Sequence, residues 1–114
     1  MDLAAKLQLR PGQSIRLVNR PPGLVLDLAT TDAPDAGPLL LFVHSQAELA
    51  DQAQLAVATA HAGRPAWIAY PKAGQLGTDL NRDRVWESLL EHGIRPIRQV
   101  SIDDTWTALR FRPA

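Results

Sequence analysis

The sequence predicts a three-layer α/β domain built on a mostly parallel open sheet with an antiparallel strand at its C-terminal end. Three observations indicate this class. The length of 114 residues fits one domain over 1–114. Apolar runs at 39–43 and 66–70 are continuous, as in strands covered on both faces. Strand-like runs alternate with helical patterns, so we expect right-handed crossovers and helices on both faces of the sheet.

The first third of the chain contains short elements. Residues 3–7 fit one or two helical turns, and β-branched residues and leucine at 15–18 predict a first strand. The Pro-Pro-Gly run at 21–23 forces a turn. Residues 24–28 are interpreted as a second extended segment, and 30–38 as a surface loop.

The middle of the chain predicts a strand, a helix and another strand. After the central strand at 39–43, Ser45 and Glu48 form a capping box that starts a helix, and Gly63 ends it. The strand at 66–70 follows. The apolar stripe of this helix comprises Leu49, Ala53, Ala56 and Ala60.

A second helix and a hairpin are predicted for the rest of the chain. Asn81 is a good N-cap and Gly93 marks the helix end. The apolar face of this helix comprises Val85, Trp86, Leu89 and Leu90. Strands at 97–102 and 106–111 are joined by the short turn 103–105, so they must be antiparallel.

Composition and charge exclude several classes of protein. Twelve basic and twelve acidic side chains cancel, which gives no general attraction to nucleic acid or to a membrane surface. The chain has no cysteine, which excludes disulfides and thiolate chemistry. No secretory signal or membrane-spanning run is visible, so we expect a cytoplasmic protein.

The common catalytic and cofactor motifs are also missing. The glycines form neither of the standard phosphate-binding loops, so no nucleotide cofactor is predicted. Ser45 adjoins His44, but adjacent residues at a strand end point to opposite sides, and capping suits Ser45 better than catalysis. The three histidines are widely separated. We therefore predict no catalytic residue and no metal site.

Polar residues at the predicted strand ends form the remaining candidate site. Ligands of open α/β sheets bind beyond the carboxyl ends of the strands. The candidate ligand-binding residues at this edge are Lys72, Thr78, Asp79, Asp103, Asp104 and Trp106. Lys72 would neutralise an anion and Trp106 would stack on a flat group. A structural interpretation remains open, in which the aspartates form turns or a helix cap, Lys72 a surface ion pair and Trp106 part of the core.

Two surfaces are candidates for contact with macromolecular partners. Several arginines lie between residues 95 and 112, but Asp103 and Asp104 interrupt them and no aromatic ladder accompanies them, so a solvated sheet face is favoured over a nucleic-acid surface. If residues 24–28 lie at a sheet edge, a homodimer through that edge is plausible.

Five ordered motifs spread over nearly the whole chain resemble one bacterial family. They are KLxLxPGQ (6–13), LFVxSxAEL (41–49), WIAYPK (67–72), TDL (78–80) and IDDTWxALRF (102–111). The family is domain of unknown function 3052, whose members often carry a second lysine where this chain has Ala73. That departure weakens anion binding by paired lysines.

The order of elements in that family is similar to class I S-adenosylmethionine methyltransferases. The resemblance implies a Rossmann-like fold. In place of the glycine-rich cofactor turn, however, the chain has Asn-Arg-Pro-Pro-Gly at 19–23, so methyl transfer is not expected. We therefore expect a non-enzymatic or degenerate Rossmann-like module that binds a protein partner or a small polar ligand. The alternative is a small enzyme or methyltransferase-related protein with its site at the carboxyl edge of the sheet.

Overall fold

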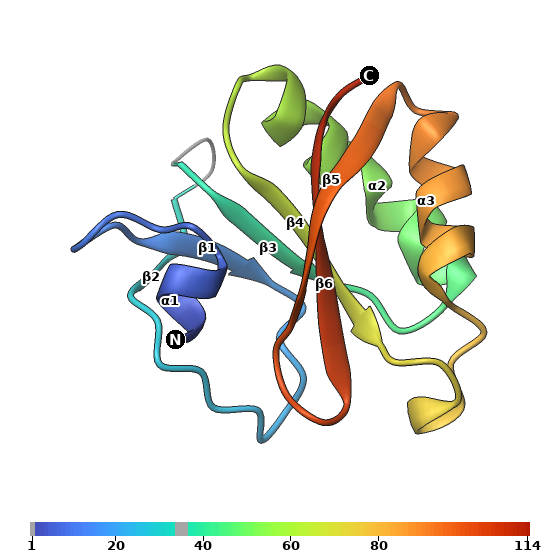
Figure 1. Ribbon diagram of the computed structural model, residues 1–114, viewed down its shortest axis with the longest axis horizontal. Coiled ribbons are helices and arrows are strands. Elements are labelled where there is room, and N and C mark those ends of the chain that lie inside the picture. Colours follow the sequence, from blue (N-terminus) through green and yellow to red (C-terminus); the bar gives the residue numbers. More distant parts are fainter. Residues whose placement is uncertain (1, 34–36) are drawn as a thin grey trace.

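Six strands form one sheet in the computed structural model, which describes residues 2–33 and 37–114. The strands are β1 (Ile15–Val18), β2 (Thr30–Thr31), β3 (Leu39–Phe42), β4 (Ala66–Pro71), β5 (Ile94–Ser101) and β6 (Trp106–Pro113). Their order across the sheet is β2-β1-β3-β4-β6-β5 (Figure 1). Neighbours from β2 to β4 are parallel, whereas β6 is antiparallel to β4 and to β5. The predicted α/β class and the antiparallel C-terminal pair are confirmed.

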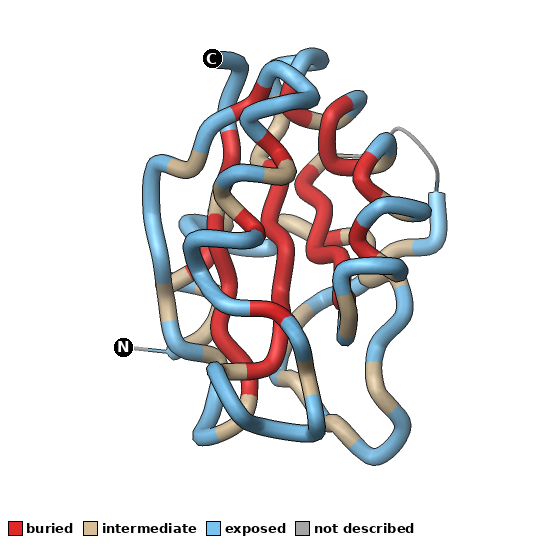
Figure 2. Tube along the Cα trace, turned by 90° about the vertical axis from the view of Figure 1, so that its right-hand side faces the viewer, coloured by how far each residue is buried: buried red, intermediate tan, exposed pale blue. Residues whose placement is uncertain are grey.

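The two continuous apolar runs form the centre of the sheet. β3 and β4 are adjacent and parallel, with Leu39 opposite Ala66 and Phe42 opposite Ala69, as predicted. Every residue of both strands is buried, and buried stretches run through the middle of the molecule (Figure 2). Because successive side chains point to opposite faces, Leu41 belongs to one core cluster and Phe42 to the other.

The two crossover helices cover the same face of the sheet. α2 (Gln46–His61) connects β3 to β4, and α3 (Arg82–Leu90) connects β4 to β5 (Figure 1). Both connections move in the same direction across the sheet, so right-handed crossovers place both helices on one side. The connection from β1 to β2 moves in the opposite direction across the sheet, so it lies on the opposite face. That second face of the sheet is covered by the leucines of segment 24–28 together with the one-turn helix α1 (Leu3–Lys6).

The predicted helix caps are present. The Ser45 hydroxyl accepts a hydrogen bond from the Glu48 amide at 3.2 Å, and the Asn81 side chain accepts one from the Arg84 amide at 2.9 Å. Gly63 follows α2 with φ +78°, a conformation that favours glycine. The four predicted stripe residues of α2 are all buried. On α3, Val85 and Leu89 are buried, but Leu90 is 44% exposed, so its assignment to the apolar face was wrong.

Residues 24–28 do not form a strand, and the prediction of a sheet edge there was wrong. The edge strand is β2, which lies inside the predicted loop 30–38; residues 34–36 of that loop lie outside the described residues. Leu24, Leu26 and Leu28 pack on the core cluster that contains Phe42, whereas Val25 is 89% exposed. The alternation therefore reflects an extended chain lying over the sheet. This segment offers no strand edge for a homodimer.

The last hairpin is longer than predicted. β5 begins at Ile94, directly after Gly93, and its pairing with β6 shifts register between Pro96 and Arg98. Proline has no amide hydrogen for the ladder, which explains an irregularity at this position on an edge strand. The turn at 103–105 lies between the two strands as predicted.

Candidate functional site

The carboxyl ends of β1, β3 and β4 meet at one edge of the sheet, because these strands are parallel. β6 runs antiparallel to β4, so the turn that precedes it reaches the same edge. The loop after β4, which contains the short 3-10 helix η1 (Gln75–Gly77), also lies there. All six predicted ligand residues therefore belong to this edge of the sheet.

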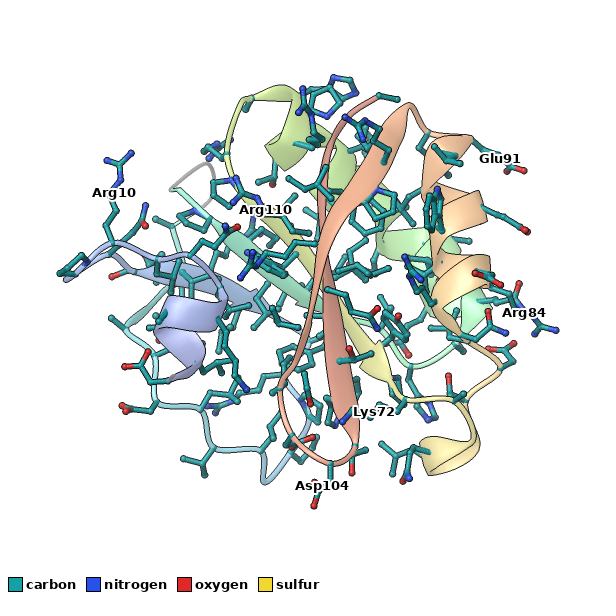
Figure 3. The ribbon with its side chains drawn as sticks, viewed as in Figure 1. Arg10, Lys72, Arg84, Glu91, Asp104 and Arg110 are labelled. Atoms are coloured by element: carbon teal, nitrogen blue, oxygen red, sulfur yellow. The ribbon has the colours of Figure 1, made fainter. Side chains whose placement is uncertain are left out.

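Lys72 lies beside the β5–β6 turn (Figure 3). Its amide donates to the carbonyl oxygen of Thr105 at 2.7 Å, and its ammonium group donates to the hydroxyl of Ser101 at 2.9 Å. The side-chain partner of Lys72 is thus a serine of β5 rather than either aspartate of the turn.

Asp103 and Asp104 have different surroundings. One carboxylate oxygen of Asp103 accepts hydrogen bonds from the amides of Thr105 at 2.8 Å and Trp106 at 2.7 Å. This is the turn-forming use of aspartate. Asp104 is exposed at the tip of the hairpin (Figure 3). Asp103 therefore has a structural role in the turn.

Thr78 and Asp79 attach the loop after β4 to the junction of β3 and α2. The Thr78 hydroxyl donates to the carbonyl oxygen of His44 at 2.6 Å, and the Asp79 carboxylate accepts from the amide of Gln46 at 2.9 Å. Gln46 is the first residue of α2, where amides lack partners within the helix and negative charge is stabilised. Asp79 thus occupies the helix end that binds phosphate in many nucleotide-binding α/β proteins.

We expect Asp79→Ala to lower the free energy of unfolding by about 1 kcal/mol, because a first-turn amide of α2 loses its acceptor and the helix dipole loses a counter-charge. Urea unfolding measures the change. Asp104→Ala is the matched control, since Asp104 is exposed, and should stay within about 0.5 kcal/mol of the wild type. Equal effects of the two variants would contradict a capping role for Asp79.

A pocket of about 240 Å³ opens between the ends of β1 and β3. Trp106, which is 6% exposed, forms one wall, and its ring packs edge-on against Phe42 with centroids 5.3 Å apart. The residues that line the pocket are Asn19, Pro21, Phe42, Val43, His44, Glu48, Leu76 and Trp106. The pocket thus combines apolar walls with three polar side chains, those of Asn19, His44 and Glu48.

Two residues at this pocket adopt left-handed backbone conformations. Asn19 has φ +61° and Leu76 has φ +53°. Asparagine tolerates this region, but leucine is strained in it, and such strain is concentrated at functional sites. The carbonyl oxygen of Leu76 lies 2.6 Å from Nε2 of His44. Because a carbonyl can only accept, His44 donates through Nε2.

The predicted residues do not surround one cleft. Trp106 lines the pocket at β1 and β3, Lys72 lines a second pocket on the other side of β4, and the remaining four lie in the turns and loops. Asn19 and His44 follow β1 and β3, so the rule that ligands bind beyond the carboxyl ends of the strands places them at this edge. The rule gives no reason to choose these two residues as ligand contacts over the others there. Leu76 carries no sequence signal for a pocket, because its position depends on the folding of the loop after β4. Glu48 was recognised only as part of the cap of α2.

Comparisons with protein-family models, curated proteins and solved structures found no match for the chain. Within residues 2–33 and 37–114, no group of three or more histidine, aspartate or glutamate side chains is placed to hold a metal ion. None of the helices described is long and apolar enough to cross a membrane.

Proposed function

We propose that this chain is a non-enzymatic or degenerate Rossmann-like module that binds a small ligand in the pocket between β1 and β3. The observation that carries the proposal is the position of this pocket. From β1 the chain continues to β2 on one side, and the sheet extends through β3 to β4 on the other. Crevices at such switch points are where open α/β sheets bind their ligands.

The lining indicates a small ligand with a flat apolar part and a polar substituent. Trp106 and Phe42 provide aromatic walls, and Leu76 covers the rim with a side chain that is 57% exposed. Asn19 and His44 offer hydrogen bonds to a polar group. A pocket of about 240 Å³ is smaller than most cofactor sites, so a ligand of about one or two rings fits best.

The hydrogen bonds around Ser45 favour binding over catalysis. Its hydroxyl accepts from the Glu48 amide, and His44 bonds to the Leu76 carbonyl. A serine–histidine pair that would activate a nucleophile is therefore not assembled here.

We also propose that the chain is related to domain of unknown function 3052, because its sequence carries the five ordered motifs. We propose a cytoplasmic location as well.

A screen of aromatic fragments tests the proposed function. We expect fragments of one or two rings to shift the amide NMR signals of Asn19, His44 and Trp106 in a saturable way. Leu76→Ser should weaken the best fragment about fivefold or more, because an apolar rim contact is lost. Val25→Ser is the control, since Val25 is 89% exposed and lines none of the pockets described.

Two results would count against this proposal. Equal weakening by the two serine variants, or shifts spread evenly over the surface, would mean that the pocket is not a specific site. A separate experiment measures the binding and turnover of S-adenosylmethionine. Saturable binding with turnover would favour the alternative of a methyltransferase-related enzyme.

A further inference from the structure

A second pocket lies between the end of β4, the start of α3 and the last hairpin. Its volume is about 210 Å³. Its lining residues are Tyr70, Lys72, Ala73, Asn81, Arg82, Gln99 and Thr107. It shares no lining residue with the pocket between β1 and β3. It is therefore a separate site, and a ligand bound here is independent of the proposed function.

Three residues with hydroxyl groups form a row across the strands beside this pocket. Tyr70, Thr107 and Ser101 are direct neighbours in the register of β4, β6 and β5. Thr107 donates to the Val100 carbonyl, and Ser101 donates to the Asp103 carbonyl while it accepts from Lys72. Two members of the row therefore have partners.

The third hydroxyl, that of Tyr70, has no partner among the described residues. Tyr70 is 2% exposed and its oxygen is shielded from solvent, yet none of these residues forms a hydrogen bond with it. A buried hydroxyl without a partner is destabilising and uncommon, so it calls for an explanation. Burial raises the pKa of Tyr70 to about 12, with Arg82 opposing the rise and Asp83 adding to it. The group is thus a hydrogen-bond donor at neutral pH.

The other polar groups of the pocket favour a negative ligand. Lys72 and Arg82 are cationic, and no acidic side chain is among the lining residues. The first turn of α3 begins here, and its leading amides lack partners within the helix. Asp83 is the nearby opposing charge, on that same first turn. Phosphate groups bind where such helix ends meet cationic side chains.

We propose that this pocket binds the phosphate group of a small ligand, with the Tyr70 hydroxyl, the Lys72 ammonium and the Arg82 guanidinium as its donors. A ligand bound here would supply the partner that the Tyr70 hydroxyl lacks among the described residues. Its charge would also be balanced by the two cationic side chains that line this pocket.

A neighbouring groove provides room for the rest of such a ligand. This groove of about 440 Å³ runs between α3 and β5 and shares Arg82 and Gln99 with the phosphate pocket. Trp86 lies in it, with the Arg82 guanidinium 5.2 Å from the centre of its ring. An aromatic phosphate monoester would therefore place its phosphate at Tyr70 and its ring near Trp86.

Titration with inorganic phosphate and with phenyl phosphate, at constant ionic strength set with chloride, tests this proposal. Amide NMR of the wild type should show saturable shifts at Tyr70, Lys72 and the first turn of α3. Tighter binding of phenyl phosphate would identify a monoester site, and equal binding a site for free phosphate. Either result supports the phosphate pocket.

Tyr70→Phe is the sharpest variant, because it removes the hydroxyl and no hydrogen bond within the protein. We expect phosphate to bind about tenfold more weakly or worse, while the variant unfolds at no lower temperature than the wild type. Lys72→Met should also weaken binding, whereas Arg112→Met, which removes an exposed charge at the opposite end of β6, should not. The proposal fails if neither anion binds saturably, or if Tyr70→Phe and Arg112→Met bind phosphate as the wild type does.

Discussion

Replacing Phe42 with alanine is expected to lower the free energy of unfolding by about 3–5 kcal/mol. Phe42 is 1% exposed and packs against Trp106, with the two ring planes at 79°. The variant loses the transfer energy of the ring, the aromatic contact, and the packing around the cavity that remains. Because domains are stable by about 5–15 kcal/mol, this is a large fraction of the total. Urea unfolding measures it.

The control for Phe42 is Val25→Ala, which removes an apolar side chain that is 89% exposed. It should change the free energy of unfolding by less than about 0.5 kcal/mol. A change below about 1 kcal/mol for Phe42→Ala would contradict tight packing between the sheet and its second face. Phe42→Leu, which keeps most of the volume, should fall between the two variants.

Stability is expected to fall by an amount on the order of 2 kcal/mol as the pH rises from 10 to 12, because of Tyr70. Burial raises the pKa of Tyr70 from 10.0 to about 12. Above pH 10 the unfolded chain loses the phenolic proton while the folded chain retains it. The unfolded state is therefore increasingly favoured until the folded form also ionises near pH 12. Below pH 10 this contribution to stability is fully present.

Tyr70→Phe isolates this effect from the titration of the lysines. The difference in unfolding free energy between the variant and the wild type should be constant below pH 10 and grow above it. Tyr70 is the chain's one tyrosine, so ultraviolet absorbance of the ionised phenol reports its titration without ambiguity. Ionisation of the folded protein near pH 10 would contradict the burial of the hydroxyl.

Local patterns predicted the frame of the fold because local forces determine it. Ser45 and Asn81 begin their helices as predicted, since each side chain bonds to an amide three residues later. The runs 39–43 and 66–70 predicted central strands because a short, continuous apolar run is typical of a strand with both faces covered.

Contacts between distant segments limited the prediction of the candidate site. Thr78 and Asp79 bond to residues 34 and 33 positions earlier in the chain, which no local pattern reveals. The leucine-rich run at 24–28 predicted an extended segment, but it could not distinguish a hydrogen-bonded strand from an extended chain over the sheet. The unpaired hydroxyl of Tyr70 was equally invisible, because it depends on what three strands and a helix place around it.

The position of β6 between β4 and β5 determines when the sheet can be completed during synthesis. Among the strands described, β5 pairs only with β6, and β4 has β6 as its second neighbour. Until residues 106–113 have been synthesised, β5 has no strand to pair with and one edge of the fully buried strand β4 stays open. Open strand edges invite aggregation, and pairing of distant segments is slow. The sheet therefore cannot be completed before β6 has been synthesised, and a chain that stops short of it exposes an open edge of β4.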